Sequence, residues 1–217
     1  MPREVKGRPY RSERRREQAE QTRQRVLDSA AVLFTERGYE GTSIAAIAAD
    51  AGVSQETIYA RFRNKRTMLG ELVERAVRGG DPAPVPEQSV PQALAAVTDQ
   101  REQLRMFAAD IVGRLERAAP LVAIVGGAAR SDPQLADLLS RLHAHRRRNL
   151  KVLVDALASN GPLRPDDDDA LETVWALTSP ELHQLLTRER GWQRDRYRDW
   201  LSDSLEHLLL TQPARDR

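Results

Sequence analysis

The chain has 217 residues, of which 30% are charged and 5% aromatic, and it contains no cysteine. The lack of cysteine excludes disulfides and thiolate catalysis and argues against a zinc site of the usual kind, so we expect no metal and no cofactor. No run of about 18 apolar residues occurs, and the N-terminus has no apolar signal-peptide core. We therefore expect a cytoplasmic protein of one or two domains without a membrane span.

Charge is unevenly distributed along the chain. Residues 1–78 hold 16 Lys and Arg against 11 Asp and Glu, whereas the remainder holds 18 against 21. A basic N-terminal part on an acidic remainder fits the binding of a polyanion at one end. Residues 1–21 are rich in arginine and lack apolar periodicity, which predicts a flexible arm. Such an arm either stays solvated or becomes ordered on DNA.

The first helix is predicted from Glu17 or Thr22 to Arg37, where Gly38 would end it. Its apolar positions fall on one face, which predicts a structural helix that supports the elements after it. These positions are Val26, Leu27, Ala30, Leu33 and Phe34.

Two short helices separated by a tight turn follow. Thr42 or Ser43 can cap the first, and its apolar residues recur at helical spacing up to Ala51. Gly52 stands where this helix must stop, and Ser54 can cap the second helix, which would run to about Arg61. Two helices joined by a tight glycine turn form a helix-turn-helix. A further helix is predicted up to Arg78.

The exposed face of the second of these helices would carry hydrogen-bonding side chains that can reach base edges in a major groove. They are Ser54, Gln55, Thr57, Tyr59 and Arg61. The polar residues alone leave open an ordinary three-helix cluster with a polar outer face. The spacing of the turn and the neighbouring sequence favour the DNA-binding interpretation.

Residues 26–72 resemble the N-terminal DNA-binding domain of the tetracycline-repressor (TetR) family. The resemblance extends to residues 175–201, which look like the C-terminal region of one branch of that family. It depends on positions that agree in order without gaps: Gly38-Tyr39, Thr42-Ser43, Ile47-Ala48, Ala51-Gly52-Val53-Ser54, Thr57, Tyr59, Phe62 and Lys65. The family consists of all-helical dimeric transcription regulators, most of which repress and are released from DNA by a small ligand.

The resemblance assigns roles to individual residues. It implies that Ser43, Tyr59 and Lys65 contact phosphates. Gln55, Thr57 and Arg61 would occupy the positions that face the groove. The chain departs from the common pattern at Ala60, where an aromatic residue is frequent, and at Arg61, where histidine is. Ala45 and Ala46 are too short to reach a base, so sequence reading would depend chiefly on Gln55 and Arg61.

Residues 79–91 contain two glycines and four prolines, which predicts a fairly stiff connection between two domains, residues 22–78 and residues 92–217. In the second domain we predict one helix from near Pro91 to about Ala118, another opened by Pro120, and a long helix from Pro133 to about Ser159. The four aspartates at 166–169 suit a helix N-terminus better than a metal site. Ser179-Pro180-Glu181 either kinks the helix that begins near these aspartates or caps a new one.

The resemblance implies that the last two helices form a dimer interface, although the same apolar stripes could instead close the core of the monomer. The candidate residues are Leu182, Leu185, Leu186, Trp200, Leu201, Leu205 and Leu208. It also implies a ligand pocket among the middle helices, which Phe107, Leu142 and Trp175 could line. Each of these three residues also suits an ordinary core position.

The sequence thus predicts an all-α protein with an N-terminal three-helix DNA-binding domain and a C-terminal helical domain for ligand binding and dimerisation. The expected function is a dimeric repressor that reads a palindromic operator in double-stranded DNA and responds to a small-molecule effector. The alternative is a non-specific DNA-binding or chromosome-organising protein. A helical enzyme is the third possibility, and we do not expect it because no convergent catalytic set is present.

Overall fold

The computed structural model describes residues 9–211, and within that range the fold is all-helical, as predicted. Apart from one isolated bridge between Leu163 and Leu210, these residues form no β-structure. No described helix is both long and apolar enough to cross a lipid bilayer. The chain divides into two compact units, one ending at Leu72 and the other beginning at Val73. Each unit has its own buried apolar residues.

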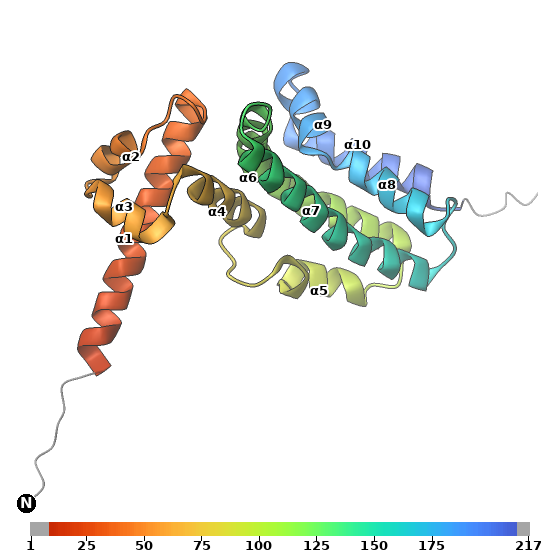
Figure 1. Ribbon diagram of the computed structural model, residues 1–217. Helices are drawn as coiled ribbons and strands as arrows, with labels where there is room; N and C mark the ends of the chain where they lie inside the picture. Colours follow the sequence, from red (N-terminus) through yellow and green to blue (C-terminus); the bar gives the residue numbers. More distant parts are fainter. Residues whose placement is uncertain (1–8, 212–217) are drawn as a thin grey trace, which may run out of the picture. The chain divides into compact units, whose positions relative to one another are not determined.

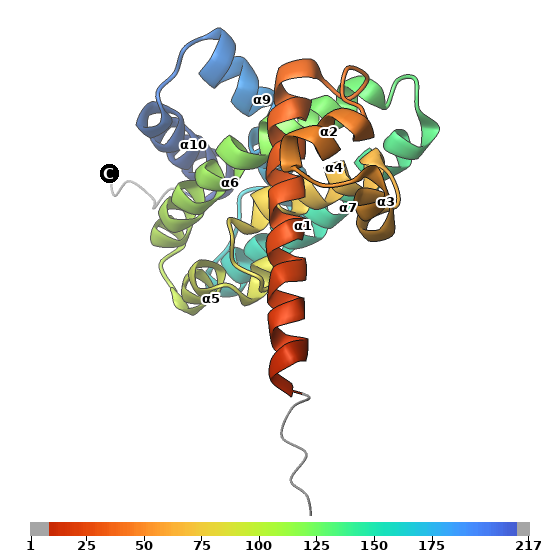
Figure 2. The same ribbon diagram turned by 90° about the vertical axis from the view of Figure 1, so that its left-hand side faces the viewer.

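The first unit consists of α1 (Pro9–Arg37), α2 (Ile44–Ala51), α3 (Gln55–Phe62) and the beginning of α4 (Lys65–Arg78). The N-terminal half of α1 extends well beyond α2 and α3 (Figures 1 and 2). The predicted stripe of α1 is buried against these short helices. The fully buried side chains include Leu27, Phe34, Ile47, Ile58, Phe62 and Leu69.

The predicted start of the first helix was wrong. The helix begins at Pro9 instead of Glu17 or Thr22, so residues 9–21, which we expected in the arm, are helical. The rest of the predicted arm lies outside the described residues. The helical segment at residues 9–21 has no apolar stripe, and its side chains from Arg14 to Gln18 are exposed. Helix formation there therefore does not depend on the burial of an apolar face, which is the signal that the sequence analysis used.

The second unit is a helical bundle in which α6 (Gln100–Ala128) and α7 (Pro133–Asn160) lie side by side (Figure 1). The helices that follow α7 are α8 (Asp167–Leu177), α9 (Pro180–Gln184) and α10 (Arg194–Leu209), with a π-helical segment at Leu185–Glu189. Asp166 caps α8 through its side chain, and Asp167, Asp168 and Asp169 occupy the first turn. These aspartates therefore serve the helix N-terminus, as expected.

The helix predicted from near Pro91 to Ala118 is in fact two helices. α5 (Ser89–Ala96) ends before Val97, and Asp99 caps α6 by accepting from the backbone N–H groups of Arg101 and Glu102. Pro120 does not open a new helix but lies inside α6. The side-chain cap at Asp99 competes with continuation of α5, and the hydrophobic spacing alone did not reveal that break.

The predicted division between domains also differs from the structure. The boundary between the units falls inside α4, at Leu72 and Val73, and not at residues 79–91. The predicted connection contains a short 3₁₀ turn at Val85–Glu87 and the start of α5. Ser179 caps α9, which resolves the question left open by the sequence in favour of a new helix.

Candidate DNA-binding and ligand-binding sites

The turn between α2 and α3 is fixed by backbone hydrogen bonds. Gly52 adopts a left-handed conformation with φ of 64°, and its N–H donates to Ala49 O at 3.3 Å. The N–H of Val53 donates to Ala48 O at 3.0 Å. These two bonds form a Schellman motif, in which glycine avoids the Cβ strain of a left-handed residue. The turn sets the direction of α3 relative to α2, as a helix-turn-helix requires.

Both short helices begin at serine caps. Ser43 Oγ accepts from Ala46 N at 3.1 Å, and Ser54 Oγ accepts from Thr57 N at 3.3 Å. Ser54 and Thr57 also share a hydrogen bond between their hydroxyl groups at 3.1 Å. The predicted groove-facing residue Thr57 is therefore partly engaged in capping α3, while the exposed Ser43 keeps its own O–H available as a donor.

The other residues predicted on α3 differ in their surroundings. Gln55 is exposed and Tyr59 is 53% exposed, so both are accessible to a ligand of the size of DNA. Arg61 is also exposed, but its guanidinium donates to Ala19 O of α1 at 3.0 Å. Arg61 thus lies toward α1, and a base contact would require it to leave this hydrogen bond.

Lys65, the predicted phosphate contact, joins two loop carbonyls within its own unit. Its Nζ donates to Tyr39 O at 2.8 Å and to Thr42 O at 2.9 Å. One of the three ammonium protons remains for another acceptor. The side chain of Thr42 is itself buried and donates toward Leu33 O or Gly38 O, at 3.0 and 2.8 Å. This partly buried network of Lys65 and Thr42 was missed, because the sequence alone does not place residues 38–42 beside residue 65.

Arg63 is a second residue that the sequence did not single out. It follows α3 directly, is exposed, and has a positive φ of 61° without being glycine. A non-glycine residue in this conformation costs free energy that its surroundings must offset, and such residues often occur at functional sites.

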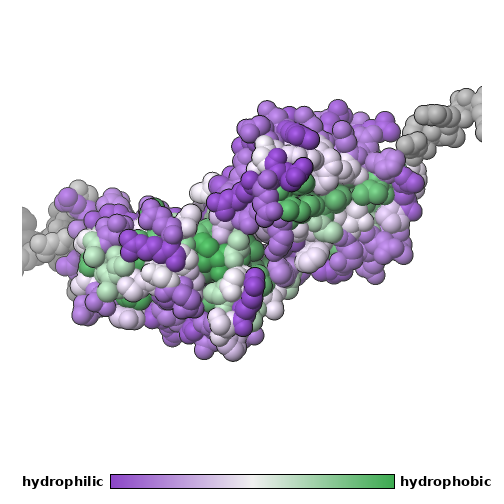
Figure 3. Space-filling model, turned by 90° about the horizontal axis from the view of Figure 1, so that it is seen from above, coloured by the Kyte–Doolittle hydropathy of each residue, from purple (hydrophilic) through white to green (hydrophobic). Residues whose placement is uncertain are grey.

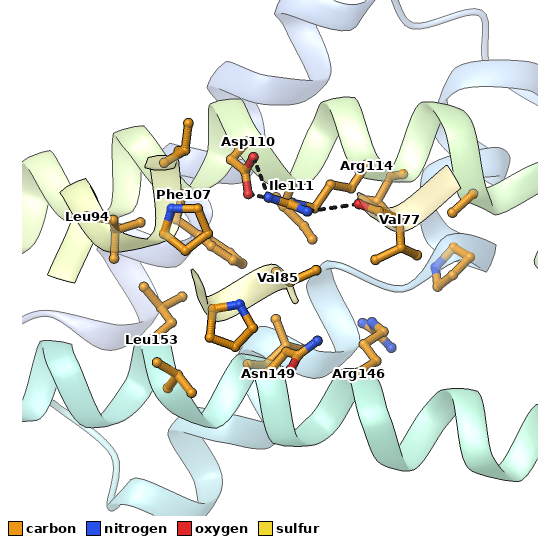
Figure 4. Close-up of a pocket in the computed structure, with 18 of the residues that line it drawn as sticks. Val77, Val85, Leu94, Phe107, Asp110, Ile111, Arg114, Arg146, Asn149 and Leu153 are labelled. Atoms are coloured by element: carbon orange, nitrogen blue, oxygen red, sulfur yellow. Dashed lines mark hydrogen bonds and ion pairs between the residues drawn. The ribbon is translucent and has the colours of Figure 1, made fainter. Parts of the chain in front are cut away.

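The second unit contains an apolar cavity of about 170 Å³ between α4, α5, α6 and α7. Figure 4 shows its lining, with Leu94 and Phe107 toward one end and Arg146 toward the other. Of the three predicted pocket residues, Phe107 and Leu142 line the cavity and Trp175 does not. Trp175 instead packs behind the lining, where its ring lies 5.0 Å from the guanidinium carbon of Arg146.

One buried ionic network borders this cavity. Arg114 is only 6% exposed and pairs with both carboxylate oxygens of Asp110, at 2.6 and 3.0 Å. It also donates to Val77 O of α4 and to Gln88 Oε1, both at 2.8 Å. Since each guanidinium nitrogen has a partner, Arg114 ties the end of α4 to α6.

The predicted dimer-interface residues fall into two groups. Leu201 and Leu205 are fully buried in the core of the second unit, so their side chains are not available to a partner. Leu185 and Leu208 are 47% and 46% exposed. The remaining three, Leu182, Leu186 and Trp200, are half-buried. Seen from above, hydrophobic residues form a strip between hydrophilic ones on the surface of the C-terminal unit (Figure 3).

Comparison with known proteins agrees with the helix-turn-helix geometry. The family model described as bacterial regulatory proteins of the tetR family matches residues 26–72. The HTH-type transcriptional regulator AcrR of Shigella flexneri is 32% identical over 105 residues, which cover 42% of this chain and 49% of AcrR. The chain thus matches about half the length of this relative.

Solved structures extend the similarity of fold to both units. NalD, the secondary repressor of the MexAB-OprM multidrug efflux pump in Pseudomonas aeruginosa, superimposes with a TM-score of 0.68 at 22% identity, over 89% of this chain and 98% of NalD. A protein from Saccharomonospora viridis, solved in complex with choline, has a TM-score of 0.66 at 24% identity, over 89% and 100% of the two chains. Residues 26–72 are therefore a DNA-binding domain of the tetR family of bacterial regulatory proteins, and the chain as a whole shares the fold of these solved structures.

Proposed function

We propose that the protein is a dimeric transcription repressor that reads a palindromic operator through α3 and is released from it by a small molecule. The observation that carries this proposal is the Schellman turn at Gly52, which fixes α2 and α3 as a helix-turn-helix with Gln55 and Tyr59 exposed. In such motifs the second helix enters the major groove. A protein that acts on chromosomal DNA in this way would function in the cytoplasm.

One helix-turn-helix contacts few base pairs, and two copies about 34–36 Å apart are needed to read successive major grooves. A homodimer through the η2 segment (Leu185–Glu189) and α10 would supply the second copy. Leu185 and Leu208 support this proposal because exposed large apolar side chains on a folded unit often mark an interface. Leu201 and Leu205 have no part in it, since they close the core of the monomer.

Regulation would operate through α4. Val73 and Val77 of this helix line the cavity, and Arg114 holds the carbonyl of Val77. The same helix begins at Lys65 in the unit that carries the helix-turn-helix. A ligand with different affinities for two positions of α4 would therefore shift the equilibrium between two states of the DNA-binding unit.

Selection of random duplex DNA by the purified protein at physiological salt tests the proposal. Salt matters because phosphate contacts alone produce tight binding at low ionic strength. We expect enrichment of a palindrome whose half-sites are centred about one helical turn apart. Binding without an enriched motif, and with an affinity that falls steeply as salt rises, would instead identify a non-specific DNA-binding protein.

A further inference from the structure

The cavity of the second unit is apolar along most of its length, and its polar groups are few. Its polar lining consists of Asp110, Arg114, His143, Arg146 and Asn149. Arg146 and Asn149 extend from α7 toward the space between α6 and α7 (Figure 4). A site with this composition binds a mainly apolar molecule and orients it through a small number of polar contacts. The charges of these polar groups therefore determine which end group the ligand can carry.

The one carboxylate among the described lining residues is already neutralised. Asp110 lies between the Nε and Nη2 atoms of Arg114, which pair with its two oxygens. Four of the five N–H groups of Arg114 have partners, because its other bonds go to Gln88 and Val77. This pair consequently adds no net charge to the cavity, and it offers no free carboxylate to a cationic ligand.

Arg146 is the charge that remains. It donates to Trp175 O and to Thr178 Oγ1, the latter at 3.0 Å, and it lies over the ring of Trp175. Among the described residues it forms no ion pair, and its Nε is buried without any hydrogen-bond partner. The exposed Glu181 attracts it only from a longer range. Burial lowers the pKa of Arg146 to about 10, so the side chain still carries its charge at neutral pH.

A mostly buried cation that forms no ion pair is unfavourable by itself, and an anion placed beside it would gain a charge-assisted hydrogen bond in low dielectric. We propose that the cavity binds an elongated, mainly apolar molecule with one terminal anionic group, such as a carboxylate, which pairs with Arg146. The apolar part would lie along the cavity toward Phe107 and Leu94. This inference rests on the proposed function and specifies the chemical class of the effector.

Isothermal titration of the purified protein, without DNA, tests the assignment with three probes that share one chain and differ in the end group: decanoate, decanol and decyltrimethylammonium. We expect decanoate to bind about ten- to a hundredfold more tightly than the other two, which is the range for a hydrogen bond to a charged group. Arg146→Met should remove this preference while decanol binding persists. The matched control is Arg148→Met, because Arg148 is exposed on the same helix.

Equal or tighter binding of decyltrimethylammonium, no binding of any probe, or an unchanged decanoate affinity in folded Arg146→Met protein would overturn the inference. The comparison of the three probes needs only the wild-type chain, so it remains decisive even if Arg146→Met does not fold. Operator binding is measured separately, by titration of labelled duplex without ligand. If the wild-type chain binds the operator but shows no preference for the anionic probe, only the proposed ligand class is rejected. If it does not bind the operator, the proposed function as a transcription repressor is rejected.

Discussion

Lys65 lies over the ring of Tyr39, with 4.2 Å between Nζ and the ring centroid, and donates a hydrogen bond to the Tyr39 carbonyl oxygen at 2.8 Å. The ammonium group thus joins the start of α4 to the loop between α1 and α2. A residue that the sequence assigns to DNA therefore also stabilises the unit that presents α3.

Replacement of Lys65 by methionine should lower the free energy of unfolding by about 1–3 kcal/mol, because the carbonyl oxygens of Tyr39 and Thr42 lose a charged donor. If the third proton contacts a phosphate, the slope of log K against log salt for operator binding should also fall by about 1. Urea unfolding and a salt titration measure the two effects. Arg63→Met is the control for stability, and a Lys65→Met protein as stable as that control would contradict this structural role.

Two glycine substitutions should change stability in opposite directions. Gly52 has a φ of 64° and Gly126 lies inside α6, and a Cβ would meet no atom within 4 Å at either position. Gly52→Ala should therefore cost about 1–2 kcal/mol of backbone strain. Gly126→Ala should gain about 0.4–1 kcal/mol, since alanine restricts the unfolded chain. Thermal unfolding at one fixed protein concentration compares them, and the same sign for both would refute the conformational argument.

The turn between α2 and α3 could be predicted because it depends on local chemistry. Ser43, Gly52 and Ser54 each act within a few residues of their own position, through caps and a left-handed turn. Arg146 could not be identified in this way. Its contacts with Trp175 and Thr178 join α7 to α8 across 29 and 32 residues of chain, and only the folded bundle brings them together.

The same limit explains the correction at α1. Ala19 lies in a stretch that has no apolar periodicity, so no burial signal marked it as helical, yet its carbonyl accepts the hydrogen bond from Arg61. In α10 an apolar pattern was present, but it did not show which residues are buried in the core and which are exposed. Leu201 and Leu205 are buried while Leu208 is exposed, and periodicity does not separate a core face from an interface face when both lie on one helix.

Arg61→Ala should relax specificity at one base pair of the operator and weaken binding by about 1–3 kcal/mol, because a guanidinium pairs with the guanine edge in the major groove. The expected result requires Arg61 to leave Ala19 O when DNA binds. Selection of random duplex DNA by the variant measures the preference at each position. An unchanged preference would show that Arg61 serves α1 and not the operator, and Gln55→Ala would then be the next variant to select with.

Leu185→Lys and Leu208→Lys should each weaken the dimer at least about tenfold, because a charge would replace a large apolar side chain at the proposed interface. Analytical ultracentrifugation over a range of concentrations measures the dissociation constant. Val32→Lys is the matched control, since Val32 is 52% exposed on α1, outside that surface. If the three variants associate equally well, the interface lies elsewhere.

Arg114 and Arg147 offer a comparison between a buried and an exposed ion pair. Arg114→Met should destabilise the second unit by about 2–4 kcal/mol, because Asp110 would keep a poorly solvated carboxylate without its counter-ion. Arg147→Met removes a pair with Glu172 whose side chains are 47% and 55% exposed, and should cost less than about 1 kcal/mol.

Chemical denaturation measures both single variants together with the double variant Arg114→Met/Asp110→Leu. The double variant should recover most of the lost stability, since it removes the isolated carboxylate along with the guanidinium. It would also release the Val77 carbonyl of α4, so we expect a smaller effect of ligand on operator affinity even where stability returns. A double variant that is stable and retains the full ligand response would exclude Arg114 from the coupling between cavity and DNA.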